Sequence, residues 1–192
     1  MKYIFVKDFR HKYRFFSPQP ISGIDIAFSR WKELWEKAKA RLMLLPKRVL
    51  AQEQAFEKAP RVEEGAVEIF YSGHPEEKKV RSKFYFFLQR QRSKHVLLLI
   101  AETLLLPLSG LMALLPGPNV FFGVLALVMI THWQALKGIN RLLKKEFTFI
   151  PHPLLGEWET AVADGAEGVY AGILDVFGEE IGYEGIRKIL WR

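Results

Sequence analysis

Apolar residues form three short runs with the length and composition of β-strands. The runs are KYIFV (2–6), AVEIFY (66–71) and FTFIP (147–151), and the third is also consistent with an extended connector. The aromatic and basic segment DFRHKYRFFSPQP (8–20) follows the first run, and its closing prolines indicate a loop. We therefore expect two or three short strands.

A helical period begins after the loop. Apolar residues then recur three or four positions apart and predict an amphipathic helix: Ile24, Phe28, Trp31, Trp35, Ala38 and Leu42. This helix is expected either to pack on a core or, with its basic and tryptophan content, to lie on a lipid surface. Pro46 ends or kinks it and is suited to the first turn of a further helix, PKRVLAQEQAFEKA (46–59).

The next helical pattern is strongly basic and then loses its charge. It starts near Pro75 with acidic residues in its first turn, where the helix dipole favours them, and seven lysines and arginines follow before residue 95. From His95 to Leu136 the only formally charged residue is Glu102. A stretch of this length suits two membrane spans of about twenty residues each.

Strong turn residues interrupt the apolar stretch near its midpoint. They divide it into two arms, 95–115 and 119–136, each about 30 Å long as a helix. The turn consists of Pro116, Gly117, Pro118 and Asn119. Proline cannot continue the helical hydrogen bonds, glycine accepts a positive φ, and asparagine can cap the second helix. The pattern predicts a helical hairpin.

The flanking charges suggest how such a hairpin would be oriented. Lysines and arginines precede the first arm and follow the second, whereas the turn has none. By the positive-inside rule both chain ends are expected on the cytoplasmic or matrix side, with Trp133 as an interface anchor. Two alternatives remain: a buried hairpin in a soluble helical protein, and a re-entrant hairpin, which Pro107 and the short second arm favour.

The remaining chain is expected to form a small helical region, with two short helices joined at Gly182. The predicted fold class is a mainly α membrane protein with a transmembrane or re-entrant two-helix hairpin, soluble helical flanks and two or three short strands. Its parts are a basic N-terminal region (1–94), the apolar hairpin (95–136) and a C-terminal helical region (137–192).

Glu102 is the candidate functional residue, because an ionised group at the centre of a membrane helix costs about 2.5–3.5 kcal/mol by insertion scales. Pairing the two arms about the turn places Glu102 level with His132 and Trp133. A Glu–His pair at one depth is suited to sharing a proton, as proton-coupled transport requires. The alternative is that Glu102 is structural and bonds Thr103, Thr131 or a neighbouring helix.

Composition and motifs exclude several other chemistries. The chain has 28 Lys and Arg against 21 Asp and Glu, and no cysteine, so disulfides and thiol catalysis are absent. The five histidines lack metal-binding spacing, and no nucleotide-binding or hydrolase motif occurs, so we expect no metal, no cofactor and no enzymatic activity. Basic residues interleaved with aromatic ones also occur in single-strand nucleic-acid binders, but beside an apolar run they fit a membrane flank better.

Residues 106–143 resemble the mitochondrial K+-H+ exchange-related family. The similarity rests on the PGPN turn, the apolar segment after it, and a further group: His132, Trp133, Ala135, Leu136 and Gly138. A more distant resemblance is to LETM-type inner-membrane proteins, which also carry a Pro-Gly turn between apolar segments. The resemblance implies an inner-membrane protein linked to potassium–proton exchange, either as the exchanger or as a factor that it requires.

The expected function is participation in, or support of, monovalent cation (K+)/proton exchange. The alternative is a membrane-anchored scaffold that does not transport. The N-terminus lacks signal-peptide and transit-peptide features, which favours a bacterial inner membrane, or the mitochondrial inner membrane in a eukaryote. Expected partners are the lipid bilayer, a monovalent cation and the proton, and further copies of the chain or a partner transporter, since one hairpin is little for an ion pathway.

Overall fold

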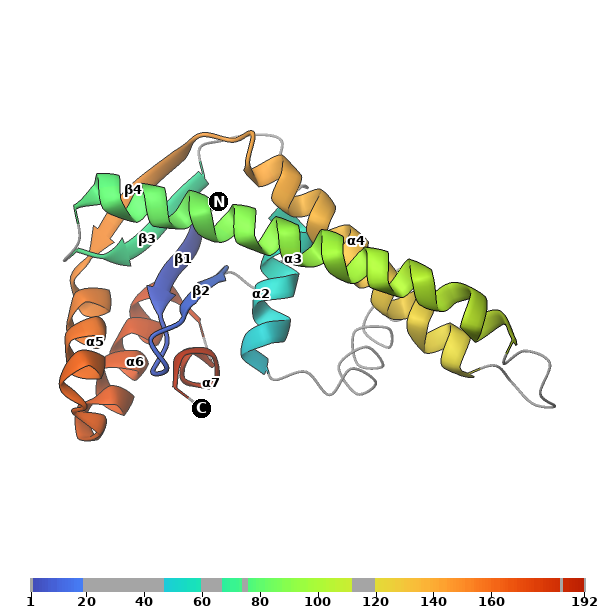
Figure 1. The fold of residues 1–192 in the computed structure, drawn as a ribbon. Helices are drawn as coiled ribbons and strands as arrows, with labels where there is room; N and C mark the ends of the chain where they lie inside the picture. The colour runs from blue at the N-terminus through green and yellow to red at the C-terminus, as the bar shows by residue number, and fades with distance from the viewer. Residues whose placement is uncertain are drawn as a thin grey trace, which may run out of the picture.

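A four-stranded sheet joins distant parts of the chain (Figure 1). The computed structural model describes residues 2–18, 47–59, 67–73, 76–111, 120–183 and 185–191. The strands, in the spatial order β2-β1-β3-β4, are β1 (Lys2–Lys7), β2 (Tyr13–Phe16), β3 (Val67–Ser72) and β4 (Phe147–His152). Three of them confirm the predicted runs. The helix predicted over 24–42 and the turn at 116–119 lie outside the described residues.

The expected loop after the first strand instead contains β2. This strand pairs antiparallel with β1, and Phe16 lies opposite Ile4. Asp8 holds the turn, since its Oδ1 accepts hydrogen bonds from the backbone N–H groups of Arg10 and Lys12. The loop prediction was wrong because β-pairing with a neighbouring strand outweighed the basic residues within the segment.

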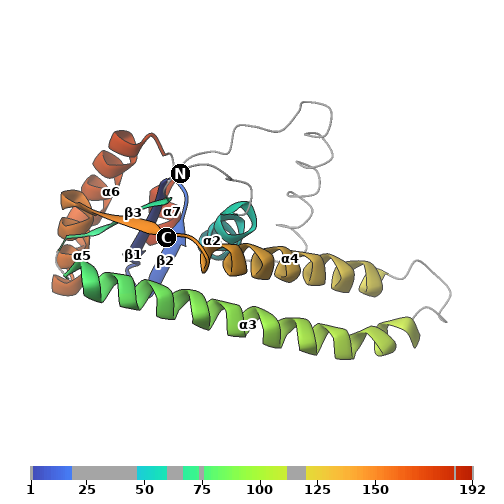
Figure 2. The same ribbon diagram turned by 90° about the horizontal axis from the view of Figure 1, so that it is seen from above.

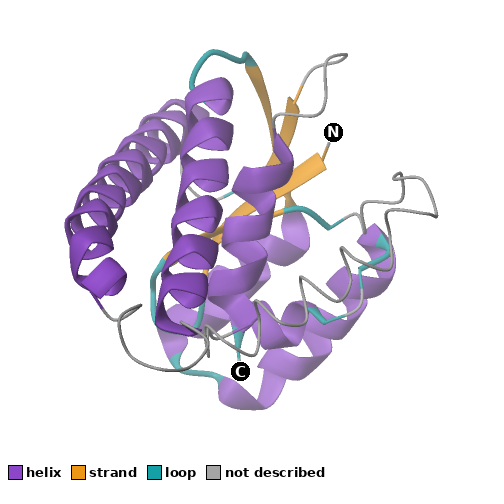
Figure 3. Ribbon diagram, turned by 90° about the vertical axis from the view of Figure 1, so that its right-hand side faces the viewer, coloured by secondary structure: helices purple, strands orange, loops and turns teal. Residues whose placement is uncertain are grey.

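Both faces of the sheet are buried, which explains the nearly continuous apolar run of β1. Tyr3 and Phe5 point into one hydrophobic core, and Ile4 and Val6 point into another on the opposite face. Adjacent residues of a strand point to opposite faces, so each core receives alternate side chains. Figure 3 shows helices on either side of the strands.

The described residues are mainly helical, as predicted, and their helices divide between the two faces. The first core contains residues of α2 (Lys47–Lys58), α3 (Glu77–Leu111) and α4 (Val120–Leu142), and the second contains residues of α5 (Pro153–Asp164), α6 (Glu167–Ile181) and α7 (Ile186–Leu190). The predicted junction at Gly182 is the left-handed residue after α6, at φ 69°. The prediction of two helices in this region omitted α5.

The long helices α3 and α4 connect the adjacent parallel strands β3 and β4. The basic segment and the described part of the first apolar arm, 95–111, form one continuous helix of 35 residues, with Pro107 inside it. Near the sheet the two helices pack on the first core, and farther along they extend together beyond it (Figures 1 and 2). Pairing of β3 with β4 therefore fixes the separation of the two helices at their base.

Candidate functional site

The candidate site lies where α2, α3 and α4 meet. Helix α2 approaches α4 very closely at Gly138, where an added Cβ would lie 1.8 Å from the carbonyl oxygen of Phe56. A glycine at this position lets the two backbones touch, which no larger residue permits. The approach brings the polar residues of α2 to the base of the α3–α4 pair.

Glu102 of α3 and His132 of α4 are in direct contact. Glu102 Oε1 lies 2.6 Å from His132 Nδ1, and the two side chains are only 9% and 13% exposed. The predicted register of the two arms therefore brought the correct pair together. His132 Nδ1–H donates to Glu102 when the glutamate is ionised, and the glutamate donates to Nδ1 when it holds the proton.

A second histidine and a second glutamate extend this pair. The ring of His95, on α3, lies 5.4 Å from the ring of His132, centroid to centroid. His95 Nε2 lies 3.3 Å from Glu53 Oε2 of α2, and both side chains are buried. The four residues, Glu53, His95, His132 and Glu102, form a row across three helices, which we call the Glu–His row.

Several polar atoms of the row are buried without a hydrogen-bond partner among the described residues. They include Nδ1 of His95 and Oε2 of Glu102. A buried polar atom without a partner costs about 1–3 kcal/mol, and such atoms in a native protein call for an explanation in function, water or ions. The polar groups of the row therefore cost stability, and packing of the three helices alone does not explain why they are present.

The alternative structural role for Glu102 named Thr103, Thr131 or a neighbouring helix as its partner. In the structure, Thr103 Oγ1 donates to the carbonyl of Leu99, and Thr131 Oγ1 donates to the carbonyl of Leu127. Each hydroxyl thus bonds its own helix, a common arrangement for threonine inside helices. The carboxylate of Glu102 contacts His132 of the neighbouring helix α4, a contact that fits a structural role as well as proton transfer.

Sequence reasoning missed His95 and Glu53. His95 precedes Glu102 by seven residues, so the two share a helix face, and this spacing was a usable signal. Glu53 lies on a different helix, and no local pattern predicts the packing of α2 against α4. Among the described residues no group of three or more histidine, aspartate and glutamate side chains is arranged to hold a metal ion.

Beyond the row, large apolar side chains of α3 and α4 are exposed. They are Val96, Leu97, Ile100, Leu104 and Leu105 of α3, and Phe122, Ile130 and Trp133 of α4. We call this set the apolar belt. Exposed large apolar side chains gathered on two neighbouring helices are typical of surfaces that contact a membrane or a partner protein. Trp133, the predicted interface anchor, belongs to it.

Only one described segment, Phe122–Leu142 of α4, is long and apolar enough to cross a membrane, and less than half of its apolar window is buried. The described part of α3 does not meet the same criterion. The structure thus supports one of the two predicted spans by length and composition, while the other stays a prediction.

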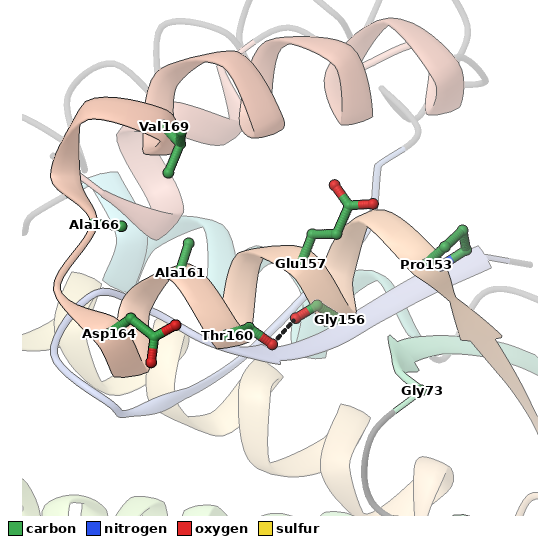
Figure 4. A pocket seen from close by; sticks show the side chains of 9 residues that line it. All are labelled: Gly73, Pro153, Gly156, Glu157, Thr160, Ala161, Asp164, Ala166 and Val169. Carbon is green, nitrogen blue, oxygen red and sulfur yellow. Dashed lines mark hydrogen bonds between the residues drawn. The ribbon is translucent and has the colours of Figure 1, made fainter.

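A shallow hollow of about 670 Å³ lies on α5 and α6, on the other face of the sheet (Figure 4). Its lining is mostly small residues with two acidic side chains, Glu157 and Asp164. The Thr160 hydroxyl there donates to the carbonyl of Gly156 in its own helix. The hollow is separate from the Glu–His row and offers no comparable buried polar group.

Comparison with known proteins identifies the family. The model of a family described as mitochondrial K+-H+ exchange-related matches residues 23–145. The chain belongs to this family. The matched region includes α2, α3 and α4, and therefore the whole Glu–His row. No curated protein and no solved structure matches the chain significantly.

Proposed function

We propose that this protein is an integral membrane protein that takes part in, or supports, exchange of a monovalent cation for a proton. The observation that carries the proposal is the contact between Glu102 and His132 within the apolar α3–α4 pair. Buried ionisable groups among apolar helices are typical of proton pathways, and family membership supplies the cation, K+.

The chemistry of the row suits proton transfer. A proton between Glu102 and His132 can reside on either group without a change in their separation, because each is donor in one state and acceptor in the other. His95 and Glu53 extend the row toward the base of the helices. Once Glu102 loses its proton, Oε2, which has no hydrogen-bond partner among the described residues, is an oxygen suited to a hard cation.

The architecture favours a hairpin inserted from one side. Helices α3 and α4 begin and end at adjacent strands, so both of their bases stay with the sheet. Cationic residues are concentrated at this base, and the apolar belt lies beyond it. In this arrangement the sheet and both termini stay on the cytoplasmic or matrix side of the membrane. Copies of the chain or a partner transporter complete the ion pathway.

The decisive variant is Glu102→Gln, which keeps the size and one acceptor oxygen but removes the titratable group. It should abolish most K+-dependent proton flux in proteoliposomes, or K+-dependent swelling of membrane vesicles if the protein supports another transporter. The matched control is Glu146→Gln, which removes an exposed carboxylate beside β4 and should leave the flux unchanged.

The competing function is a membrane-anchored scaffold whose hairpin only holds the sheet and its helices at the bilayer. The apolar belt, by itself, fits this function equally well. A Glu102→Gln protein that still inserts and retains full K+-dependent flux or swelling would favour the scaffold and contradict the exchange proposal.

A further inference from the structure

A cavity of about 650 Å³ lies at the base of the α3–α4 pair, and its lining includes none of the four residues of the Glu–His row. It is bounded by the β1–β2 hairpin, α2 and α3, and five lysines and arginines line it: Lys12, Arg14, Lys83, Arg90 and Lys94. We call it the basic cavity. No acidic side chain of the described residues is part of its lining.

Most of this positive charge is not neutralised by the protein. Arg14 is paired, since its guanidinium lies 2.8 Å from Asp8 Oδ2. The four remaining cations form no ion pair with a carboxylate of the described chain. Like charges gathered around one hollow repel each other, so their grouping favours an anion between them.

Neutral groups in the lining complement the cations. Gln52 and Gln91 are part of the cavity lining, and the side-chain oxygen of each is buried without a hydrogen-bond partner among the described residues. Gln52 is only 5% exposed. Because amide oxygen and nitrogen are interchangeable in position, either residue can present N–H groups to a ligand. The Tyr13 phenol also lines the cavity and is a hydroxyl donor at neutral pH, since its ordinary pKa is near 10 and burial raises it further.

The cavity continues into the apolar belt along one face of α3. Residues 83, 87, 90 and 94 line the cavity and are spaced four, three and four apart. The same spacing continues through Leu97, Ala101 and Leu104, all of which are exposed. Cationic donors thus lead directly to apolar surface, in the same order as the phosphate and the acyl chains of a phospholipid.

We propose that the basic cavity binds a phosphate group, supplied by an anionic phospholipid whose acyl chains lie along Leu97 and Leu104. Lysine and arginine donate charge-assisted hydrogen bonds to phosphate oxygens, and arginine can do so with two parallel bonds. The proposal concerns anion binding and does not depend on ion exchange. A soluble phosphate ester is the other possible source of the same chemistry.

The test compares two triple variants of the full chain with equal loss of charge. Lys83→Gln, Arg90→Gln and Lys94→Gln empty the cavity of three cations, whereas Lys78→Gln, Lys79→Gln and Lys144→Gln remove three exposed cations outside it. Binding is measured to phosphatidylcholine vesicles with and without phosphatidylglycerol, and to glycerol phosphate for the detergent-solubilised protein. The cavity variant should lose roughly tenfold or more of the affinity that phosphatidylglycerol adds, since each cation near an anionic surface contributes appreciably. The control should lose much less.

The two ligands separate the sources of phosphate. Dependence on phosphatidylglycerol without binding of glycerol phosphate assigns the site to lipid, and binding of glycerol phosphate that the cavity variant loses assigns it to soluble esters. Equal losses in both triple variants, or no preference of the wild type for either phosphate ligand, would overturn the proposal. Should the triple variant melt at a lower temperature than wild type, the single variants Arg90→Gln and Lys94→Gln, at exposed positions, replace it.

Discussion

At the scale of single residues, Gly138 controls how the candidate site is assembled. Alanine normally stabilises a helix relative to glycine by up to about 1 kcal/mol. Here its Cβ would overlap the carbonyl oxygen of Phe56, so α2 must move away from α4. We expect Gly138→Ala to lower the free energy of unfolding by about 1–3 kcal/mol, the usual cost of overpacking. Urea unfolding in mild detergent measures it.

A matched glycine supplies the control for this substitution. Gly172 lies within α6, and an added Cβ there meets no atom within 4 Å. Gly172→Ala should therefore leave stability unchanged or raise it. If both alanine variants were equally stable, the close contact between α2 and α4, and with it the placement of Glu53 beside His95, would be incorrect.

The Glu–His row also shows what can be predicted about a site from one chain. The expected level of Glu102 and His132 followed from pairing two arms about a central turn, and the two side chains are in contact. His95 lies seven residues before Glu102, and this spacing places both residues on one face of a helix. Glu53 depends on contact between helices distant in sequence, and such contacts are decided by side-chain packing rather than by local pattern.

At the scale of elements, substitution of the exposed leucines of α3 distinguishes a membrane hairpin from a soluble one. Leu97 and Leu104 are 68% and 71% exposed, so replacing both with glutamine removes little packing within the protein. In a bilayer the same change exposes two amides to hydrocarbon, which is costly. We expect the double variant to be retained less in the membrane pellet after alkaline carbonate extraction.

The control for this prediction lies on α6, where Val169 and Val176 are 51% and 53% exposed. Replacing both with glutamine should not alter membrane retention. Wild-type protein released entirely by carbonate would instead indicate a soluble hairpin, whose exposed leucines then contact another protein.

Elements were predictable from sequence where local pattern and tertiary context agreed. The strands β1, β3 and β4 carry dense apolar runs, whereas β2 has arginine and tyrosine positions and depends on its partner β1. Helix α3 was expected as a basic helix followed by an apolar arm, but a change of charge does not interrupt helical hydrogen bonds, and one helix spans both. Pro107 lies inside it despite the missing N–H.

At the scale of the whole molecule, buried tyrosines make stability dependent on alkaline pH. Burial raises the pKa of Tyr3 in the central strand β1, and it also raises the pKa of Tyr183. The unfolded chain loses these protons near pH 10, whereas the folded chain keeps them. The stabilisation is therefore complete below pH 10 and is lost as the pH rises further, because proton loss then favours unfolding.

Replacing Tyr3 with phenylalanine should flatten this dependence, since phenylalanine has no proton to lose in either state. For each pH unit between the unfolded and folded pKa values, the free energy of unfolding of the wild type falls by about 1.4 kcal/mol per tyrosine. The variant lacks the contribution of Tyr3. Chemical unfolding followed from pH 8 to pH 12 should give a shallower decline for Tyr3→Phe than for Tyr85→Phe, which removes a hydroxyl from α3. Parallel declines would mean that Tyr3 is solvated, and that the core between the sheet and α3 is less closely packed than its stacked contact with Phe15 indicates.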